Sequence, residues 1–91
     1  MTSQPVISVV FGTLNQKDVL QRVLAAYEEV RFPKESFEVI VVDSTSSDGT
    51  GEWMQTYRPS YAFKGIVQPN NGKAAARNRG VREAKIGRAH V

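Results

Sequence analysis

The apolar run Val-Ile-Val-Val at residues 39–42, followed by Asp43, limits the possible folds of this chain more than any other feature. An uninterrupted run of β-branched residues is typical of a strand buried on both faces of a parallel sheet. Open parallel sheets bind ligands beyond the carboxyl ends of their strands. A second apolar run, residues 6–11, also leads into small polar residues at 12–15. We therefore expect one sheet edge to carry the polar groups of a ligand pocket.

The chain has 91 residues, enough for one small domain. It contains no cysteine, which excludes a disulfide scaffold, a thiolate metal site and a cysteine nucleophile. No apolar run approaches the roughly 18 residues that a membrane span requires. The first residues show neither the basic patch nor the apolar core of a signal peptide. These features lead us to expect a cytoplasmic protein.

Strand and helix patterns alternate along the chain. The patterns predict strands over residues 6–11, 37–42 and 62–67, and helices over 17–30, 50–57 and 73–85, with Ser47 or Asp48 as the N-cap of the second helix. This order predicts an α/β fold, a three-layer Rossmann-like βαβαβα unit with a parallel sheet. Simple winding places strand 6–11 at an edge, although its apolar sequence suits a central strand. We therefore expect a further partner strand for it, outside this chain.

The last six residues differ in character from the rest. Residues 86–91, Ile-Gly-Arg-Ala-His-Val, match the peptide that results when a common sequencing adapter is translated. We expect them to be a non-native tail and residues 1–85 to be the N-terminal part of a longer protein. His90, the only histidine of the chain, would then have no functional role.

Three polar residues at the strand ends are candidates for ligand binding. Asp43 can accept a hydrogen bond from a base N–H or a ribose hydroxyl, or it can cap its own loop in an Asx-turn. Thr13 and Asn15 follow the first strand and can line a base pocket, or Asn15 can be the N-cap of the first helix. A nucleotide or sugar nucleotide is the ligand that this arrangement favours.

The segment from Asn70 onward adds a site for an anion. Gly72 opens the third helix, whose N-terminus offers free N–H groups and the positive end of the helix dipole. Lys73 and Arg77 lie four residues apart on one helix face and can neutralise a diphosphate. The segment is not a P-loop, because the first glycine and the hydroxyl after the lysine are missing.

Three blocks, residues 7–15, 38–50 and 71–80, together resemble the opening of the family 2 glycosyltransferases with a GT-A fold. They occur in order and at the expected spacing, and the resemblance covers nearly all of residues 5–85. It implies an inverting transferase that uses a nucleotide sugar, most often a UDP-sugar, with a divalent metal, Mg or Mn. The acceptor would be a glycan or lipid, and membrane association of the parent protein is compatible with this.

The resemblance also implies roles for single residues. Thr13 and Asn15 would border the uracil, and Asp43 would accept from its N3–H. The residues beside the base and diphosphate would be Gly72, Lys73 and Arg77. The chain departs from the common family pattern at Leu14, where a tyrosine is usual, and at Ser44, where a second aspartate is usual.

The resemblance does not extend to the metal-binding and catalytic residues that the family uses for sugar transfer. The family uses a metal-binding Asp-x-Asp and a later catalytic carboxylate, and the sequence contains no Asp-x-Asp. We therefore expect this chain alone to be inactive. The alternatives are a non-catalytic Rossmann-type nucleotide-binding module and weak nucleic-acid binding through the basic third helix. That helix lacks the interleaved aromatic residues that stack on bases, so we expect no nucleic-acid partner.

Overall fold

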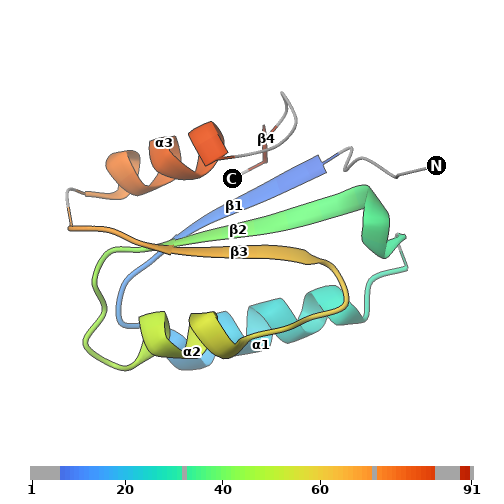
Figure 1. Ribbon diagram of the computed structural model, residues 1–91, viewed down its shortest axis with the longest axis horizontal. Coiled ribbons are helices and arrows are strands. Elements are labelled where there is room, and N and C mark those ends of the chain that lie inside the picture. Colours follow the sequence, from blue (N-terminus) through green and yellow to red (C-terminus); the bar gives the residue numbers. More distant parts are fainter. Residues whose placement is uncertain (1–6, 32, 71, 84–88, 91) are drawn as a thin grey trace.

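The computed structural model describes residues 7–31, 33–70, 72–83 and 89–90. Strands and helices alternate through most of this length, as Figure 1 shows. The elements are β1 (Ile7–Thr13), α1 (Lys17–Glu28), the short 3-10 helix η1 (Lys34–Ser36), β2 (Phe37–Asp43), α2 (Thr50–Thr56), β3 (Ala62–Val67), α3 (Lys73–Glu83) and β4 (Ala89–His90).

The strands form one parallel sheet in the order β3-β2-β1-β4. In register, Ile7 lies opposite Phe37 and Glu38 opposite Ala62. β2 is therefore a central strand, and all seven of its residues are buried. The predicted Rossmann-like α/β fold with a parallel sheet and a central second strand is confirmed.

One expectation about the sheet is wrong. Ala89 and His90 of this chain pair in parallel with Ser8 and Val9 of β1, so β1 finds a partner strand within the chain. These two residues belong to the expected tail of residues 86–91, whose other members lie outside the described residues. A pairing of two residues leaves no pattern in the sequence from which it could be predicted. The non-native origin of the tail stays a prediction.

The element bounds differ from the predicted ones by a few residues. β1 continues two residues beyond the predicted end, because Thr13 still pairs with Asp43 of β2. α1 ends at Glu28 rather than at residue 30, where the next N–H, of Glu29, bonds to the Ala26 carbonyl oxygen at 3.0 Å. α3 ends at Glu83, and residues 84 and 85 of the predicted helix lie outside the described residues.

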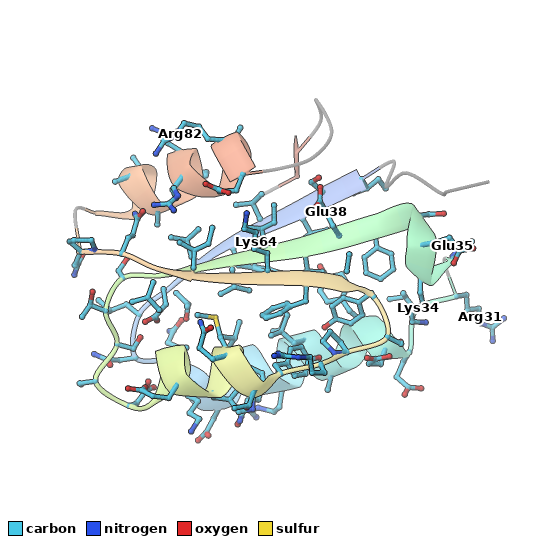
Figure 2. The ribbon with its side chains drawn as sticks, viewed as in Figure 1. Arg31, Lys34, Glu35, Glu38, Lys64 and Arg82 are labelled. Carbon is cyan, nitrogen blue, oxygen red and sulfur yellow. The ribbon has the colours of Figure 1, made fainter. Side chains whose placement is uncertain are left out.

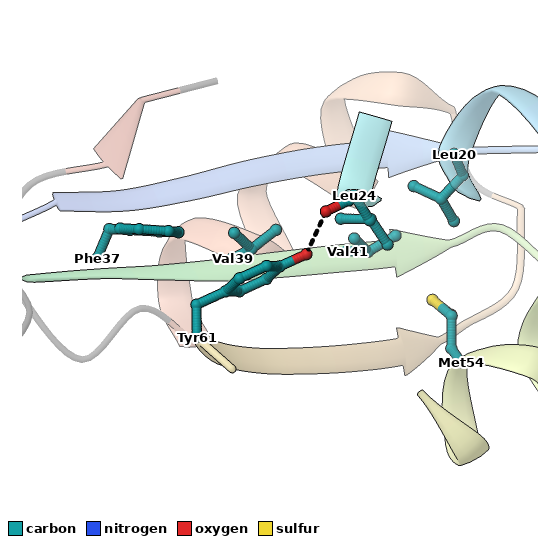
Figure 3. Close-up of a cluster of buried hydrophobic side chains, with 7 residues drawn as sticks. All are labelled: Leu20, Leu24, Phe37, Val39, Val41, Met54 and Tyr61. Carbon is teal, nitrogen blue, oxygen red and sulfur yellow. Dashed lines mark hydrogen bonds between the residues drawn. The ribbon is translucent and has the colours of Figure 1, made fainter. Parts of the chain in front are cut away.

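Helices α1 and α2 cover one face of the sheet, the lower one in Figure 1. Their apolar side chains meet those of β2, as Figure 3 shows. The Tyr61 hydroxyl donates a hydrogen bond to the Leu24 carbonyl oxygen at 2.8 Å, and burial raises the pKa of this phenol above its ordinary value. The buried members of this cluster are Leu20, Leu24, Phe37, Val39, Val41, Met54 and Tyr61.

Helix α3 covers the opposite face and packs closely on β1 and β2. Small residues permit this approach. A Cβ atom at Gly80 would lie only 2.2 Å from Cγ1 of Val10, and one at Gly12 would lie 3.3 Å from Cβ of Ala76. The buried cluster on this face is also smaller, with Val10, Ile40, Val42, Ile66 and Ala76.

Charged residues gather around the start of β2, at the amino end of the sheet. Figure 2 shows Arg31, Lys34 and Glu35 there, far from the loops that follow β1 and β2. Arg82 lies on the side of α3 that faces away from the sheet, and it is exposed. The carboxyl end of the sheet is therefore the place where the predicted site residues converge.

Candidate functional site

The carboxyl ends of β1, β2 and β3 are joined by backbone hydrogen bonds. The Ser44 N–H donates to the Thr13 carbonyl oxygen at 3.0 Å, and the Gln68 N–H donates to the Asp43 carbonyl oxygen at 2.9 Å. The strand register also places Thr13, Asp43 and Val67 side by side. This edge is a fixed base on which the following loops are built.

Asp43 is almost wholly buried, with 1% of its surface exposed. Its Oδ2 accepts the Ser46 N–H at 2.8 Å, and its Oδ1 accepts the Ser46 hydroxyl. The carboxylate lies against α2, where a Cβ atom at Gly51 would be 4.0 Å from Oδ2. The interpretation of Asp43 as a cap of its own loop is confirmed. Its role as a ligand acceptor stays a prediction.

Asn15 connects the loop after β1 to the loop after β2. Its N–H donates to the Ser46 hydroxyl oxygen at 2.7 Å, and its Oδ1 accepts the Ser47 N–H at 2.8 Å. The residue adopts the left-handed conformation, φ 52°, which asparagine tolerates better than most residues. The alternative interpretation of Asn15 as a helix N-cap is wrong, because the N-cap of α1 is Gln16.

Asp48 also connects two elements. Its Oδ1 accepts the Thr50 N–H at 3.1 Å and the Thr50 hydroxyl at 2.5 Å, and its Oδ2 accepts the Lys17 N–H at 3.0 Å. These bonds, the one from the Thr50 side chain first, lower the pKa of the Asp48 carboxyl. The predicted N-cap of α2 at Ser47 or Asp48 is wrong. The N-cap is Gly49, which takes the left-handed conformation with φ 89°.

A cavity of about 530 Å³ opens at this edge, on the α3 side of the sheet. Its size is that of a pocket for a small organic ligand. The loop after β1 contributes Gly12, Thr13, Leu14 and Gln16. The remaining lining residues are Ser44, Asn70, Gly72, Ala76 and Arg77.

The start of α3 forms one wall of this cavity. Gly72 has a left-handed backbone, φ 96°, and its N–H donates to Asn70 Oδ1 at 3.2 Å. A Cβ atom at Gly72 would meet no atom within 4 Å, so the glycine is required by backbone conformation and not by space. Arg77 follows one helical turn after Lys73, and its side chain is exposed at the cavity. An anion placed here would meet a helix N-terminus and a guanidinium together.

Comparison with known proteins identifies the family of this chain. The family model described as Glycosyl transferase family 2 matches residues 8–86. This chain belongs to glycosyl transferase family 2.

Individual relatives agree with this family. The chain is 34% identical over 87 residues to Glycosyltransferase AglE of Haloferax volcanii, covering 92% of the chain and 29% of AglE. It is 34% identical over 89 residues to the probable glycosyltransferase YdaM of Bacillus subtilis, covering 92% of the chain and 21% of YdaM. The chain thus spans less than a third of the length of these curated relatives.

Solved structures of glycosyltransferases share the fold. The mannosyltransferase PcManGT from Pyrobaculum calidifontis, in complex with GDP-Man and Mn²⁺, superimposes with a TM-score of 0.78 at 32% identity, over 92% of this chain and 26% of PcManGT. S. aureus TarS 1-349 in complex with UDP gives a TM-score of 0.73 at 28% identity, over 87% of this chain and 24% of TarS. The predicted family and the GT-A type of fold are confirmed.

Five of the six predicted site residues of this family 2 segment have described side-chain positions, and these five fall into two groups. Thr13, Gly72 and Arg77 line one cavity. Asn15 and Asp43 lie beside it and hold the loops that shape it. Lys73 is the first residue of α3, and its side chain is outside the described part of the structure. The structure therefore brings half of the predicted set together around one space.

Ser44 and Asn70 were not predicted as site residues, although both line the cavity. A signal for Ser44 exists in the strand alternation. Successive side chains of β2 point to opposite faces, so Val42 and Ser44 share the α3 face while Asp43 faces α2. No comparable signal marks Asn70, which lies in a turn where its Oδ1 accepts the Gly72 N–H.

In the part of the chain that the structure describes, no group of three or more histidine, aspartate or glutamate side chains is placed to hold a metal ion. The described residues therefore do not form a metal centre by themselves. No helix among them is long and apolar enough to cross a membrane.

Proposed function

We propose that this chain is the nucleotide-sugar-binding segment of an inverting glycosyltransferase, which moves a sugar from a UDP-sugar to an acceptor hydroxyl. The observation that carries the proposal is the cavity between the ends of β1 and β2 and the start of α3. It combines a polar floor, at Thr13, with a cationic wall, at Arg77. A nucleoside diphosphate has the matching pair of features, a base with polar edges and an anionic tail.

Each part of the ligand has a corresponding group in the proposal. The diphosphate lies at the N-terminus of α3, beside Gly72, Lys73 and Arg77, where backbone N–H groups and two cations favour it. The base lies towards Thr13, at the ends of the strands. Asn15 and Asp43 hold the loops beneath it through Ser46.

The similar structures support the choice of ligand. PcManGT is in complex with GDP-Man and Mn²⁺, and TarS 1-349 is in complex with UDP. Since these proteins are about four times as long as the region they share with this chain, we propose that the acceptor site and the divalent metal ligands lie outside the described residues. The acceptor would be a glycan or lipid, handled in the cytoplasm or at the cytoplasmic face of a membrane.

Titration calorimetry with UDP, with and without Mn²⁺, tests the proposal. Arg77→Gln removes a charged hydrogen-bond donor from the cavity, and we expect the affinity for UDP to fall about tenfold or more. Arg82→Gln is the matched control, because Arg82 is exposed on the same helix and points away from the sheet. Equal effects of the two substitutions would contradict the assigned site.

The same preparation separates the alternatives. Binding of single-stranded DNA with a steep dependence on salt would favour the basic surface of α3 as a nucleic-acid interface. UDP binding unaffected by every cavity substitution would also argue against the proposal. We expect the chain alone to transfer no sugar, because the metal-binding and general-base carboxylates are not among its residues, and robust transfer would contradict this.

A further inference from the structure

We propose that Asp48 is a positioning residue for nucleotide binding, which holds one wall of the cavity by capping helix α1 from another loop. Asp48 is exposed and does not line the cavity itself. It acts on the ligand only through the segment that it holds. The inference rests on the proposed function, and it adds a residue that sets affinity without touching the ligand.

The wall in question is the segment that joins β1 to α1. Residues 14–16 lie between the end of β1 and the start of α1 and belong to neither. Leu14 and Gln16 of this segment line the cavity, together with Gly12 and Thr13 at the end of β1. Because the segment has no strand or helix bonds of its own, its position depends on what holds it at each end.

This segment lies alongside the loop that follows β2 and is bonded to it at a regular step. The Asn15 N–H donates to the Ser46 hydroxyl oxygen at 2.7 Å. Two residues further along both loops, the Lys17 N–H donates to Asp48 Oδ2 at 3.0 Å. Both bonds join residues 31 positions apart. The two loops therefore continue side by side beyond the paired strands, and Asp48 is the last point of attachment.

Asp48 provides for α1 what the helix's own N-cap does not provide. The N-cap residue, Gln16, makes no side-chain hydrogen bond to the helix. The first N–H groups of a helix have no partner within it, and Asp48 Oδ2 accepts that of Lys17. A carboxylate at a helix N-terminus is also stabilised by the helix dipole. The start of α1, and with it the end of the cavity wall, is thus fixed by a residue of a different loop.

The two carboxylate oxygens of Asp48 have different partners. Oδ2 bonds to α1, whereas Oδ1 accepts the N–H and the hydroxyl of Thr50, at 3.1 and 2.5 Å, at the start of α2. Thr50 is 0% exposed, so Oδ1 is attached to the buried part of the molecule. Asp48 therefore links the cavity wall to α2, and the two halves of this link can be altered separately.

Charge and position predict opposite effects when Asp48 is replaced. UDP is an anion, so the loss of a negative charge near its site should by itself strengthen binding. Loss of the cap should weaken binding, because residues 14–16 are no longer held. We expect Asp48→Ala to weaken UDP binding about threefold to tenfold, the effect of losing a helix cap. Titration calorimetry on the whole chain, well below the melting temperature, measures it.

Glu52→Ala is the matched control for charge. Glu52 is an exposed carboxylate in the first turn of α2 and does not line the cavity. We expect its removal to leave the UDP affinity unchanged or slightly higher. Asp48→Ala with the affinity of wild type, or a loss as large in Glu52→Ala, would overturn the inference and leave the proposed function standing.

Thr50→Val separates positioning from a general loss of stability. The substitution removes the hydroxyl that bonds to Asp48 Oδ1, keeps a branched side chain in the buried position, and leaves the bond from Lys17 intact. We expect a lower melting temperature but an unchanged UDP affinity, because lost stability reduces binding only through the unfolded fraction. Equal losses of affinity in Thr50→Val and Asp48→Ala would show that the role of Asp48 is merely structural.

A measurement on wild type does not depend on the folding of any variant. If the bond from Lys17 to Asp48 strengthens UDP binding, UDP must strengthen that bond by the same factor. We expect saturating UDP to slow hydrogen exchange of the Lys17 amide about threefold to tenfold. The Ser36 amide, which bonds to the Pro33 carbonyl oxygen at the amino end of the sheet, should change clearly less.

The outcomes separate the two proposals. Exchange at Lys17 that is unaffected by bound UDP would overturn this inference alone. Absence of UDP binding to wild type would overturn the proposed function and this inference together.

Discussion

The two faces of the sheet are packed in different ways. Towards α1 and α2 the sheet meets large side chains, with Leu24, Phe37 and Tyr61 almost wholly buried. Aromatic rings add to this face, where the Phe37 and Tyr61 centroids lie 5.4 Å apart. Towards α3 it meets small residues, and Gly80 comes so near to Val10 that a Cβ atom has no room.

The difference suggests that one face of the sheet mainly stabilises the fold and that the other mainly shapes the ligand cavity. The face with large side chains holds the larger cluster of buried apolar residues, so we interpret it as the scaffold. The face with small residues lets a helix lie close to the sheet, and two of those residues, Gly12 and Ala76, also line the cavity. Close packing of α3 on the sheet therefore accompanies the placement of Ala76 and Arg77 at the cavity.

The largest expected effect comes from the scaffold face. Leu24→Ala removes a side chain with 0% exposure, and we expect the free energy of unfolding to fall by about 2–5 kcal/mol. Urea denaturation followed by circular dichroism measures it. Val19→Ala is the control, since Val19 lies in the same helix and is 47% exposed. A loss no greater in Leu24→Ala than in Val19→Ala would show that this face is not the scaffold.

The next effect belongs to the α3 face. Gly80→Ala places a methyl group where Val10 already lies, and we expect a loss of about 1–3 kcal/mol of stability from overpacking. Because α3 must move outward, the UDP affinity should fall as well, measured by calorimetry at a temperature where the variant stays folded. Asn78→Ala, at an exposed position of α3, is the control. An unchanged UDP affinity in Gly80→Ala would separate the packing of α3 from the site.

The sequence predicts the scaffold better than it predicts the site. The alternation of elements, the central place of β2 and the parallel direction all follow from apolar patterns that extend over many residues. The N-cap of α2 does not, because Asp48 accepts from both Thr50 and Lys17 and so serves a tertiary contact as well as the helix start. A contact between residues 31 positions apart, Lys17 at the start of α1 and Asp48, leaves no local pattern in the sequence.

The positions of Asp43 and Ser44 show a second reason why the site is harder to predict than the scaffold. Asp43, a charged residue at a strand end, is the most conspicuous candidate in the sequence. Strand alternation turns it towards α2 and turns the uncharged neighbour Ser44 towards the cavity. The next residue, Thr45, has a left-handed backbone with φ 63°. Which of two adjacent polar residues meets a ligand depends on this backbone geometry, and residue type alone does not indicate it.

The smallest expected effect concerns the pKa values of two carboxyl groups, Glu83 on the α3 side of the sheet and Glu28 on the α1 side. On the α3 side, hydrogen bonds from Lys64 and then Arg79 lower the pKa of Glu83 below its ordinary 4.5. On the α1 side, the hydroxyl and then the N–H of Ser60 lower that of Glu28 below 4.5. A lowered pKa means that the native state favours the charged form. Each contribution to stability is therefore present above about pH 4.5 and is lost as pH falls through the lower native pKa.

Added salt should change the pKa values of these two carboxyl groups by different amounts, because their hydrogen-bond partners differ in charge. Glu83 is held by two cations, with Lys64 Nζ at 2.6 Å and Arg79 Nε at 3.2 Å, so high salt should raise its pKa towards 4.5. Glu28 is held mainly by neutral donors of Ser60, so its pKa should move less. An NMR titration of both carboxyl groups at low and high salt measures this. Lys64→Gln should remove most of the salt dependence of Glu83 and none of that of Glu28. Equal salt shifts at the two sites would mean that the net charge of the protein, and not the local partner, sets both values.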